Sequence, residues 1–329
     1  MPDHLGDLPV GLLRAYALLF GLVWGSFLNV VIYRVPLGMS VVRPASHCPA
    51  CGKPIRAWDN IPVLGYLLLR GKARCCGARL SPRYPLVEAI GGVLSLAILE
   101  AIVFRMPPDT SLARAGAVYI ADLALALGLT AGAFIDAEHM ILPDSITYGG
   151  AVLGLATSSL REVPFLDSLL GGLFGFLVIW LPFIVLYKRL RGMPGMGLGD
   201  AKLLMLAGAW FGWGGALFVL GLGAVQGTVF ALFTWLFRGK IDDPEAVPRW
   251  REGLQKELET LSPEERAEAE KELAEDMLSE EPGQGVGKAR LAFGPFLALA
   301  TIEALFDSRA VVTALTDRVV GAVFGWFGL

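Results

Sequence analysis

The sequence predicts an all-α polytopic membrane protein with about eight transmembrane helices, a small cytoplasmic loop domain that carries cysteines, and a polar helical insert. Hydrophobic residues make up 54% of the 329 residues and charged residues 18%, whereas about a quarter of the residues in a soluble domain are charged. Apolar runs of about twenty residues, the length that crosses a bilayer, recur along the chain. All four cysteines lie between positions 48 and 76, which indicates a local metal or redox cluster rather than a distributed disulfide framework.

The first apolar run extends from about Leu12 to Tyr33 and ends at Arg34. Because no basic segment and cleavage site accompany it, we interpret this run as a retained spanning helix rather than a signal peptide. Further spans are predicted at 86–104, 115–135, 145–160, 168–187, 203–218, 219–237 and 291–306. The tail 310–329 is interrupted by Asp317-Arg318, so it is predicted to be either an interfacial helix or a ninth span.

These runs divide the chain into five predicted segments. They are a first transmembrane helix (1–34), a cytoplasmic cysteine-rich domain (35–85), a transmembrane core (86–237), an acidic cytoplasmic insert (238–290) and C-terminal transmembrane or interfacial helices (291–329). The middle of the insert, Glu252 to Glu281, is rich in Glu, Lys and Ala and is typical of a solvated helix with i,i+4 charge pairs. We expect a surface hairpin that ends in a flexible stretch at 282–285; a docking role for a partner is the alternative.

Lysine and arginine placement predicts the orientation of the spans. The loop between Arg34 and Arg83 is strongly basic, so we expect it in the cytoplasm. Because successive spans alternate in direction, counting from this loop places the turns at 136–144 and 188–202 on the cytoplasmic side as well. Two acidic residues at these turns, Asp136 and Asp200, are therefore predicted to face the cytoplasm together.

The cysteine loop begins with Cys48-Pro49-Ala50-Cys51-Gly52, the turn that supplies two thiolates to a zinc site. The second pair, Cys75 and Cys76, is adjacent rather than separated by two residues, and neighbouring thiolates form a strained chelate. One alternative is that only one of the two binds the metal and that His47 is a substitute ligand. A structural metal site and a reduced or redox-active cluster without metal both remain open.

Asp136 and Asp200 each lie where an apolar run meets a polar turn. Membrane-embedded acids are functional candidates because an ionised carboxylate at the edge of hydrocarbon is costly. The simpler interpretation is that Asp136, Glu138 and His139 only mark an interfacial turn, and Asp144 is expected to be the N-terminal charge of the next helix.

Glycines surround Asp200 in Gly195-Met196-Gly197-Leu198-Gly199-Asp200, which allows close approach of a peptide. Two carboxylates held close share a proton, an arrangement that favours peptide hydrolysis without a metal.

Several motifs occur in the order found in one family of membrane enzymes. They are Gly25-Ser26-Phe27-Leu28-Asn29-Val30 through Arg34, Cys48-Pro49-Ala50-Cys51, Trp58-Asp59-Asn60-Ile61-Pro62, Arg83-Tyr84-Pro85-Leu86-Val87-Glu88, Ile135-Asp136 to Leu142-Pro143-Asp144, Gly195 through Lys202, and Phe293-Gly294-Pro295. With them the chain resembles the type IV prepilin leader peptidases, bifunctional enzymes of the Gly-x-Gly-Asp aspartyl protease class. The resemblance covers nearly the whole chain outside the insert.

This resemblance implies that Asp136 and Asp200 are the catalytic aspartates. The enzyme would cut the basic leader of type IV prepilins or type II secretion pseudopilins after a glycine, at the cytoplasmic face of the bacterial inner membrane. It would then methylate the new N-terminus with S-adenosylmethionine, for which the residues by themselves indicate no binding site. Zinc on Cys48, Cys51, Cys75 and Cys76 is the second expected cofactor. The expected partners are the pilin-like substrates and membrane lipid, with no nucleic acid.

The second cysteine pair departs from the family pattern, which has another Cys-x-x-Cys. Alignment on Arg83-Tyr84-Pro85 places Cys76 on its second cysteine and Ala73 on its first, so Cys75 is out of register. This departure bears on zinc binding and, less directly, on methylation, but not on proteolysis. Two alternatives therefore stay open: a Gly-x-Gly-Asp peptidase without methyl transfer, and a transporter in which the two acids carry protons or ions.

Overall fold

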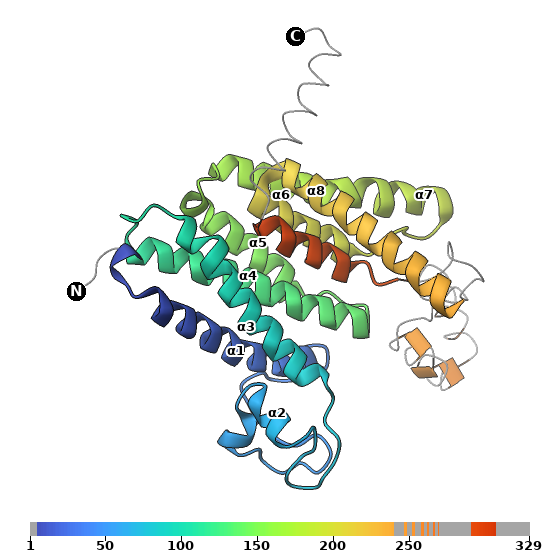
Figure 1. The fold of residues 1–329 in the computed structure, drawn as a ribbon. Coiled ribbons are helices and arrows are strands. Elements are labelled where there is room, and N and C mark those ends of the chain that lie inside the picture. The colour runs from blue at the N-terminus through green and yellow to red at the C-terminus, as the bar shows by residue number, and fades with distance from the viewer. Residues whose placement is uncertain are drawn as a thin grey trace. The chain divides into compact units, whose positions relative to one another are not determined.

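The fold was taken from a computed structural model that describes residues 5–239 and 291–306, with isolated positions between 247 and 269 (Figure 1). Within these residues the protein is helical, and its only strand-like pairings are two isolated bridges, His47 with Pro54 and Lys72 with Arg79. The predicted flexible stretch at 282–285, the tail 310–329 and most of the predicted insert helix lie outside the described residues.

The helical elements follow one another along the chain with short connections. They are η1 (Leu5–Asp7), α1 (Val10–Arg34), η2 (Ala57–Asn60), α2 (Leu64–Leu68), α3 (Arg83–Ala101), η3 (Val103–Arg105), α4 (Leu112–His139), α5 (Asp144–Ala156), η4 (Ser158–Arg161), α6 (Phe165–Ile179), the π-helical η5 (Trp180–Leu186), α7 (Tyr187–Arg191) and α8 (Leu198–Arg238). A short apolar helix, Gly294–Phe306, follows the insert. The π-helical turn contains Pro182, whose missing N–H interrupts α-helical hydrogen bonding.

The chain forms two compact units, residues 1–131 and 132–329. In the first unit α1 packs along α3, where small residues bring the two backbones together. A Cβ atom on Gly25 would lie 2.8 Å from the Cα atom of Glu88. The buried Ser95 hydroxyl donates to the carbonyl of Ala17 at 2.5 Å and lies 2.6 Å from the Tyr119 hydroxyl. These contacts join α1, α3 and the first part of α4.

In the second unit α8 packs against both α5 and α6. The Trp210 indole is fully buried and donates to the Gly150 carbonyl of α5 at 2.8 Å. On the other side, the Ser168 hydroxyl of α6 donates to the carbonyl of Ala209. Gly171 of α6 has no room for a side chain, because its Cβ would lie 2.6 Å from the Cα atom of Gly212. The first half of α8 is therefore held between two helices.

The all-helical membrane class is confirmed, but the count of eight spans is not. Five described helices are long and apolar enough to cross a membrane: Val10–Arg34, Arg83–Arg105, Leu112–His139, Phe165–Arg191 and Leu198–Arg238. The predicted span at 145–160 corresponds to α5, whose 13 residues cover about 20 Å, less than the roughly 30 Å of hydrocarbon. The helix that replaces the predicted span 291–306 is also short.

The predicted spans 203–218 and 219–237 form one element, the 41-residue α8. Its break lies at Gly212, where φ is 71° and ψ is −176°, and not at the predicted boundary near 218. Glycine adopts a positive φ at little cost because it has no Cβ. The apolar composition continues through the break, so hydropathy alone did not locate it.

Candidate active site and metal centre

Asp136 lies in the last turn of α4, and its side chain is buried, with 7% of the residue exposed. Its carboxylate accepts a hydrogen bond from the backbone N–H of Gly294. Gly294 is the first residue of the helix Gly294–Phe306, so the carboxylate faces a helix N-terminus, where free amides and the helix dipole favour negative charge. The helix after the insert thus holds Asp136 from a point 158 positions away in the sequence.

Gly294 is a site residue whose role was not predicted from the sequence. A Cβ atom at this position would lie 2.5 Å from Asp136 Oδ2 and 3.0 Å from Leu142 Cδ1. No side chain fits there unless the carboxylate moves. The only signal in the sequence was the Phe293-Gly294-Pro295 motif, which carried the family resemblance without indicating a contact.

Asp200 is the third residue of α8, which has Gly197 as its N-cap. Its carboxylate accepts a hydrogen bond from the Gly197 backbone N–H, which is one half of a capping box. Asp200 therefore caps its own helix, and its side chain is turned back over the Gly-rich turn. Gly199 in this turn packs against Leu142, whose Cβ atom would lie 3.1 Å from a Cβ on the glycine.

The structure brings Asp136 and Asp200 together within the second unit, close enough for their carboxylates to repel each other electrostatically. Leu142 contacts both glycines that border the pair, Gly199 and Gly294. Three chain segments thus converge on the two acids: the end of α4, the start of α8 and the start of the helix Gly294–Phe306. Such a pair can hold one proton between two oxygens and exchange it with water.

Asp144 does not join this pair. It is the first residue of α5, as predicted, and it accepts a bond from Lys202 Nζ at 2.5 Å. Lys202 also lies over the ring of Tyr148, 5.1 Å from the ring centroid. Because Lys202 lies two residues after Asp200 near the start of α8, this ion pair ties the start of α8 to the start of α5.

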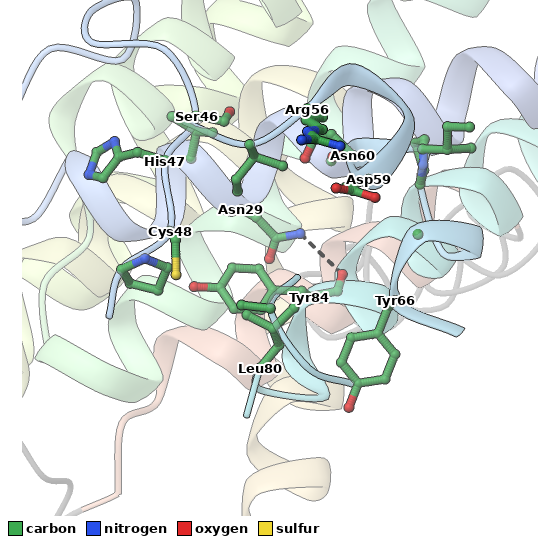
Figure 2. A pocket seen from close by; sticks show the side chains of 18 of the residues that line it. Asn29, Ser46, His47, Cys48, Arg56, Asp59, Asn60, Tyr66, Leu80 and Tyr84 are labelled. Carbon is green, nitrogen blue, oxygen red and sulfur yellow. Dashed lines mark hydrogen bonds between the residues drawn. The ribbon is translucent and has the colours of Figure 1, made fainter. Parts of the chain in front are cut away.

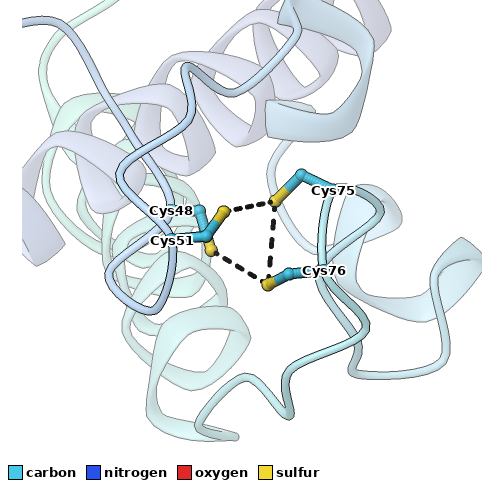
Figure 3. Close-up of side chains that lie close together, drawn as sticks. All are labelled: Cys48, Cys51, Cys75 and Cys76. Atoms are coloured by element: carbon cyan, nitrogen blue, oxygen red, sulfur yellow. Dashed lines mark hydrogen bonds between the residues drawn. The ribbon is translucent and has the colours of Figure 1, made fainter.

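The first unit holds the four cysteines in one cluster (Figure 3). Their sulfur atoms all lie within 4.8 Å of one another; the Cys51–Cys75 distance is 3.3 Å, Cys48–Cys76 3.7 Å and Cys75–Cys76 3.9 Å. A tetrahedral zinc ion with Zn–S bonds of about 2.3 Å would place its ligands about 3.8 Å apart. The donor set therefore fits zinc. His47 is outside the group, with its Nδ1 3.1 Å from the Ala45 carbonyl.

Two similar turns present these sulfur atoms. In the first turn, Cys48 N donates to Lys53 O and Gly52 N donates to Cys48 O, each at 2.8 Å. In the second, Ala73 N donates to Ala78 O and Gly77 N to Ala73 O, again at 2.8 Å. Gly52 and Gly77 both have a φ of 70°. Ala73 thus occupies the place that Cys48 has in the first turn, and Cys76 the place of Cys51.

Cys75 supplies the fourth sulfur from the middle of the second turn, one position before Cys76. Backbone hydrogen bonds from Ala50 and Cys51 lower the pKa of Cys48 to about 7. A hydrogen bond with Cys51 is the largest of the contacts that raise the pKa of Cys75 to about 12. The turn around Cys48 therefore favours the thiolate, which is the form that binds a metal, whereas the contacts of Cys75 favour its protonated thiol.

The first unit also contains a cavity of about 800 Å³, shown in Figure 2. Residues of α1, of the cysteine loop and of the start of α3 line it, among them Asn29, Asp59, Tyr84 and Glu88. Cys48 and Cys75 lie in its wall, so the cavity adjoins the cysteine cluster. Several of these residues are motif positions in the sequence, but nothing in the sequence predicted that they share a cavity.

Two family profiles match the chain. The Bacterial Peptidase A24 N-terminal domain matches residues 19–102, and the Type IV leader peptidase family matches residues 123–232. The first match contains the cysteine cluster and the cavity, and the second contains both aspartates. The insert lies outside both.

Relatives named prepilin leader peptidase/N-methyltransferase match over most of their length. One from Burkholderia pseudomallei (strain 1026b) is 35% identical over 269 residues, which cover 72% of this chain and 82% of the relative. One from Klebsiella pneumoniae is 39% identical over 220 residues, 65% of this chain and 91% of the relative. One from Myxococcus xanthus (strain DK1622) is 37% identical over 243 residues, 73% of this chain and 67% of the relative. No solved structure matches this chain.

Proposed function

Because the chain belongs to the type IV leader peptidase family, we propose that it is an inner-membrane aspartic peptidase that removes the leader of type IV prepilins or type II secretion pseudopilins and then methylates the new N-terminus. Asp136 and Asp200 are the catalytic residues in this proposal. The observation that carries it is the convergence of these two carboxylates, from helices that begin or end at the same place in the second unit.

The geometry suits hydrolysis by a carboxylate pair. One carboxylate removes a proton from a water molecule, whose oxygen attacks the carbonyl carbon of the scissile peptide. The protonated partner donates to the peptide, so that the C–N bond breaks and the amine leaves with a proton. The backbone amides of Gly294 and Gly197 hold the two carboxylates in place.

The cysteine cluster and the cavity supply the second half of the proposed function. Cys48, Cys51, Cys75 and Cys76 would hold a zinc ion, which would join the two turns of the loop as a structural cross-link. S-adenosylmethionine, the donor that the relatives' methyltransferase names imply, supplies an electrophilic methyl group when bound. The chain's task is to hold that donor where the freed substrate amine can reach it.

A single assay tests both halves. The purified protein, in lipid, is given a full-length prepilin and labelled S-adenosylmethionine, and leader loss is followed by mass while label is followed in the product. We expect both products from the unmodified protein. Asp136→Asn and Asp200→Asn should each lower the cleavage rate by about a thousandfold or more, because general acid–base catalysis contributes about that much. Cleavage by either variant at near the normal rate would refute the assignment.

Other outcomes favour the alternatives. Cleavage without label in the product would leave a peptidase that lacks methyl transfer. No cleavage of any prepilin, together with ion uptake that depends on Asp136, would favour transport.

A further inference from the structure

The cavity of the first unit has the size and position of a small-molecule site. Its volume of about 800 Å³ lies within the range of about 300–1,000 Å³ that is typical of ligand pockets. It is bounded by α1, by α3 and by the loop that carries the cysteines. The cavity is therefore large enough to hold a small molecule.

One wall of this cavity carries an acid that has no basic partner in the described part of the chain. Glu88 is 9% exposed, and its carboxylate accepts the Val63 backbone N–H at 2.6 Å and a hydrogen bond from Ser26. The other acid in the lining, Asp59, is neutralised by Arg74, with N–O distances of 2.9 and 3.0 Å. Glu88 is therefore the lining acid available to a positively charged ligand.

A second polar atom in the wall also lacks a partner. Asn29 is 6% exposed; its Nδ2 donates to the Tyr84 carbonyl at 3.1 Å, but its Oδ1 is buried and has no hydrogen-bond partner among the described residues (Figure 2). Buried acceptors are nearly always satisfied, so such an exception requires an explanation. A ligand that donates a hydrogen bond into the cavity would satisfy Asn29.

The remaining charges in the lining are basic. Arg34 is buried, and its Nη1 donates to the Ser40 carbonyl at 3.0 Å. Lys53 and Arg56 both line the cavity and are solvent-exposed. The cavity thus offers a buried carboxylate in one place and exposed cations in another. A purely anionic nucleotide would be repelled by Glu88, and a purely cationic ligand would be repelled by Lys53 and Arg56. The lining matches a ligand that carries both signs.

We propose that this cavity is the binding site for S-adenosylmethionine, with Glu88 as the counter-charge of the sulfonium cation, Asn29 Oδ1 as a hydrogen-bond acceptor for the ligand, and Lys53 and Arg56 as partners of its carboxylate. The inference rests on the proposed methyl transfer. It places the donor in the same unit as the cysteine cluster, whose Cys48 and Cys75 share the cavity wall. The cluster then acts on methyl transfer by holding the loop half of the cavity in place.

Equilibrium binding of labelled S-adenosylmethionine to the full chain, without any pilin substrate, tests this site. Glu88→Gln keeps an acceptor for Val63 and removes the charge. We expect its Kd for S-adenosylmethionine to rise about tenfold, as for loss of a hydrogen-bonded charge. Its Kd for S-adenosylhomocysteine, which has no sulfonium charge, should change less than twofold. Glu100→Gln is the matched control, because Glu100 lies on the same helix but pairs with Arg14 outside the cavity.

Equal affinities for the donor in Glu88→Gln and in the unmodified protein would overturn the proposal. A photoreactive analogue of S-adenosylmethionine, cross-linked to the unmodified protein, provides a readout that does not depend on any variant folding. Label in peptides that contain residues 26–34, 46–62 or 80–88 supports the site, and label confined to residues 132–239 refutes it. Absence of binding by the unmodified protein also refutes it, and leader cleavage by the same preparation shows whether the peptidase proposal fails with it.

Discussion

The cysteine cluster and the aspartate pair bring their reactive groups together by different means. The cluster is built from two hydrogen-bonded turns that lie within 29 residues of one another, and each turn repeats the other's backbone pattern. The aspartate pair needs three helix ends, one of which comes after the insert. The two turns keep four sulfur atoms together although one cysteine is displaced by one position, whereas the aspartate pair depends on the contact at each helix end.

The largest effect should follow a change at the helix that completes the aspartate site. Gly294→Ala would place a methyl group 2.5 Å from Asp136 Oδ2, so the carboxylate has to move. A displacement of about 1 Å in a catalytic group costs about a hundredfold in rate, and we expect at least that loss of leader cleavage. Gly221→Ala, also in the second unit, is the control, since nothing lies within 4 Å of its Cβ. Similar cleavage by the two variants would show that Gly294 does not position Asp136.

Zinc retention by the cysteine cluster should depend on the number of cysteines that the second turn presents, and a cysteine at position 73 should replace one at position 75. Cys75→Ala removes the fourth sulfur, and we expect zinc loss to a chelator to accelerate by at least about tenfold, because even partners outside the ligand shell cost 10–100-fold in affinity. Adding Ala73→Cys to Cys75→Ala should restore retention, since Ala73 occupies the place of Cys48 in the second turn. Ala73→Ser in the same background is the control. Leader cleavage should stay within about twofold throughout; its loss together with the metal would mean that the two sites are coupled.

A smaller effect is expected from the ion pair that ties α8 to α5. Asp144 is 62% exposed in its side chain, and exposed pairs contribute about 0–1 kcal/mol. Lys202→Met should therefore lower leader cleavage less than about fivefold. Asp144→Asn should have a similar effect, and the double variant should be no worse than either single one. If the losses of cleavage rate in the two single variants multiply in the double variant, Lys202 acts on the reaction by another route.

The smallest effect should come from the insert. It lies outside both family matches, and its predicted role is a surface hairpin. Deletion of residues 245–285 should leave leader cleavage within about twofold of the full chain, measured on the same prepilin. A folded deletion variant without cleavage would show that the insert is needed, for instance to bring Gly294 to Asp136.

Much of this protein follows from the sequence alone, because hydropathy and spacing are local properties. Apolar runs determine where the long helices lie, the four cysteines determine a cluster, and the turns around Asp136 and Asp200 mark two acids at helix ends. The alignment that placed Ala73 at a cysteine position of the family agrees with the structure, because Ala73 has the place in the second turn that Cys48 has in the first. The role of these residues in catalysis and metal binding is what the experiments above address.

Other features depended on the tertiary structure, since they arise between segments that are distant in sequence. The apolar stretch that the sequence divided near residue 218 is one element, α8, whose backbone departs from helical geometry at Gly212 without any change in composition. The amide that holds Asp136 comes from Gly294, and no periodicity links those positions. The cavity forms only when α1, α3 and the cysteine loop are packed together. Local patterns determine which segments are helical and which residues can react, but only packing decides which of them meet.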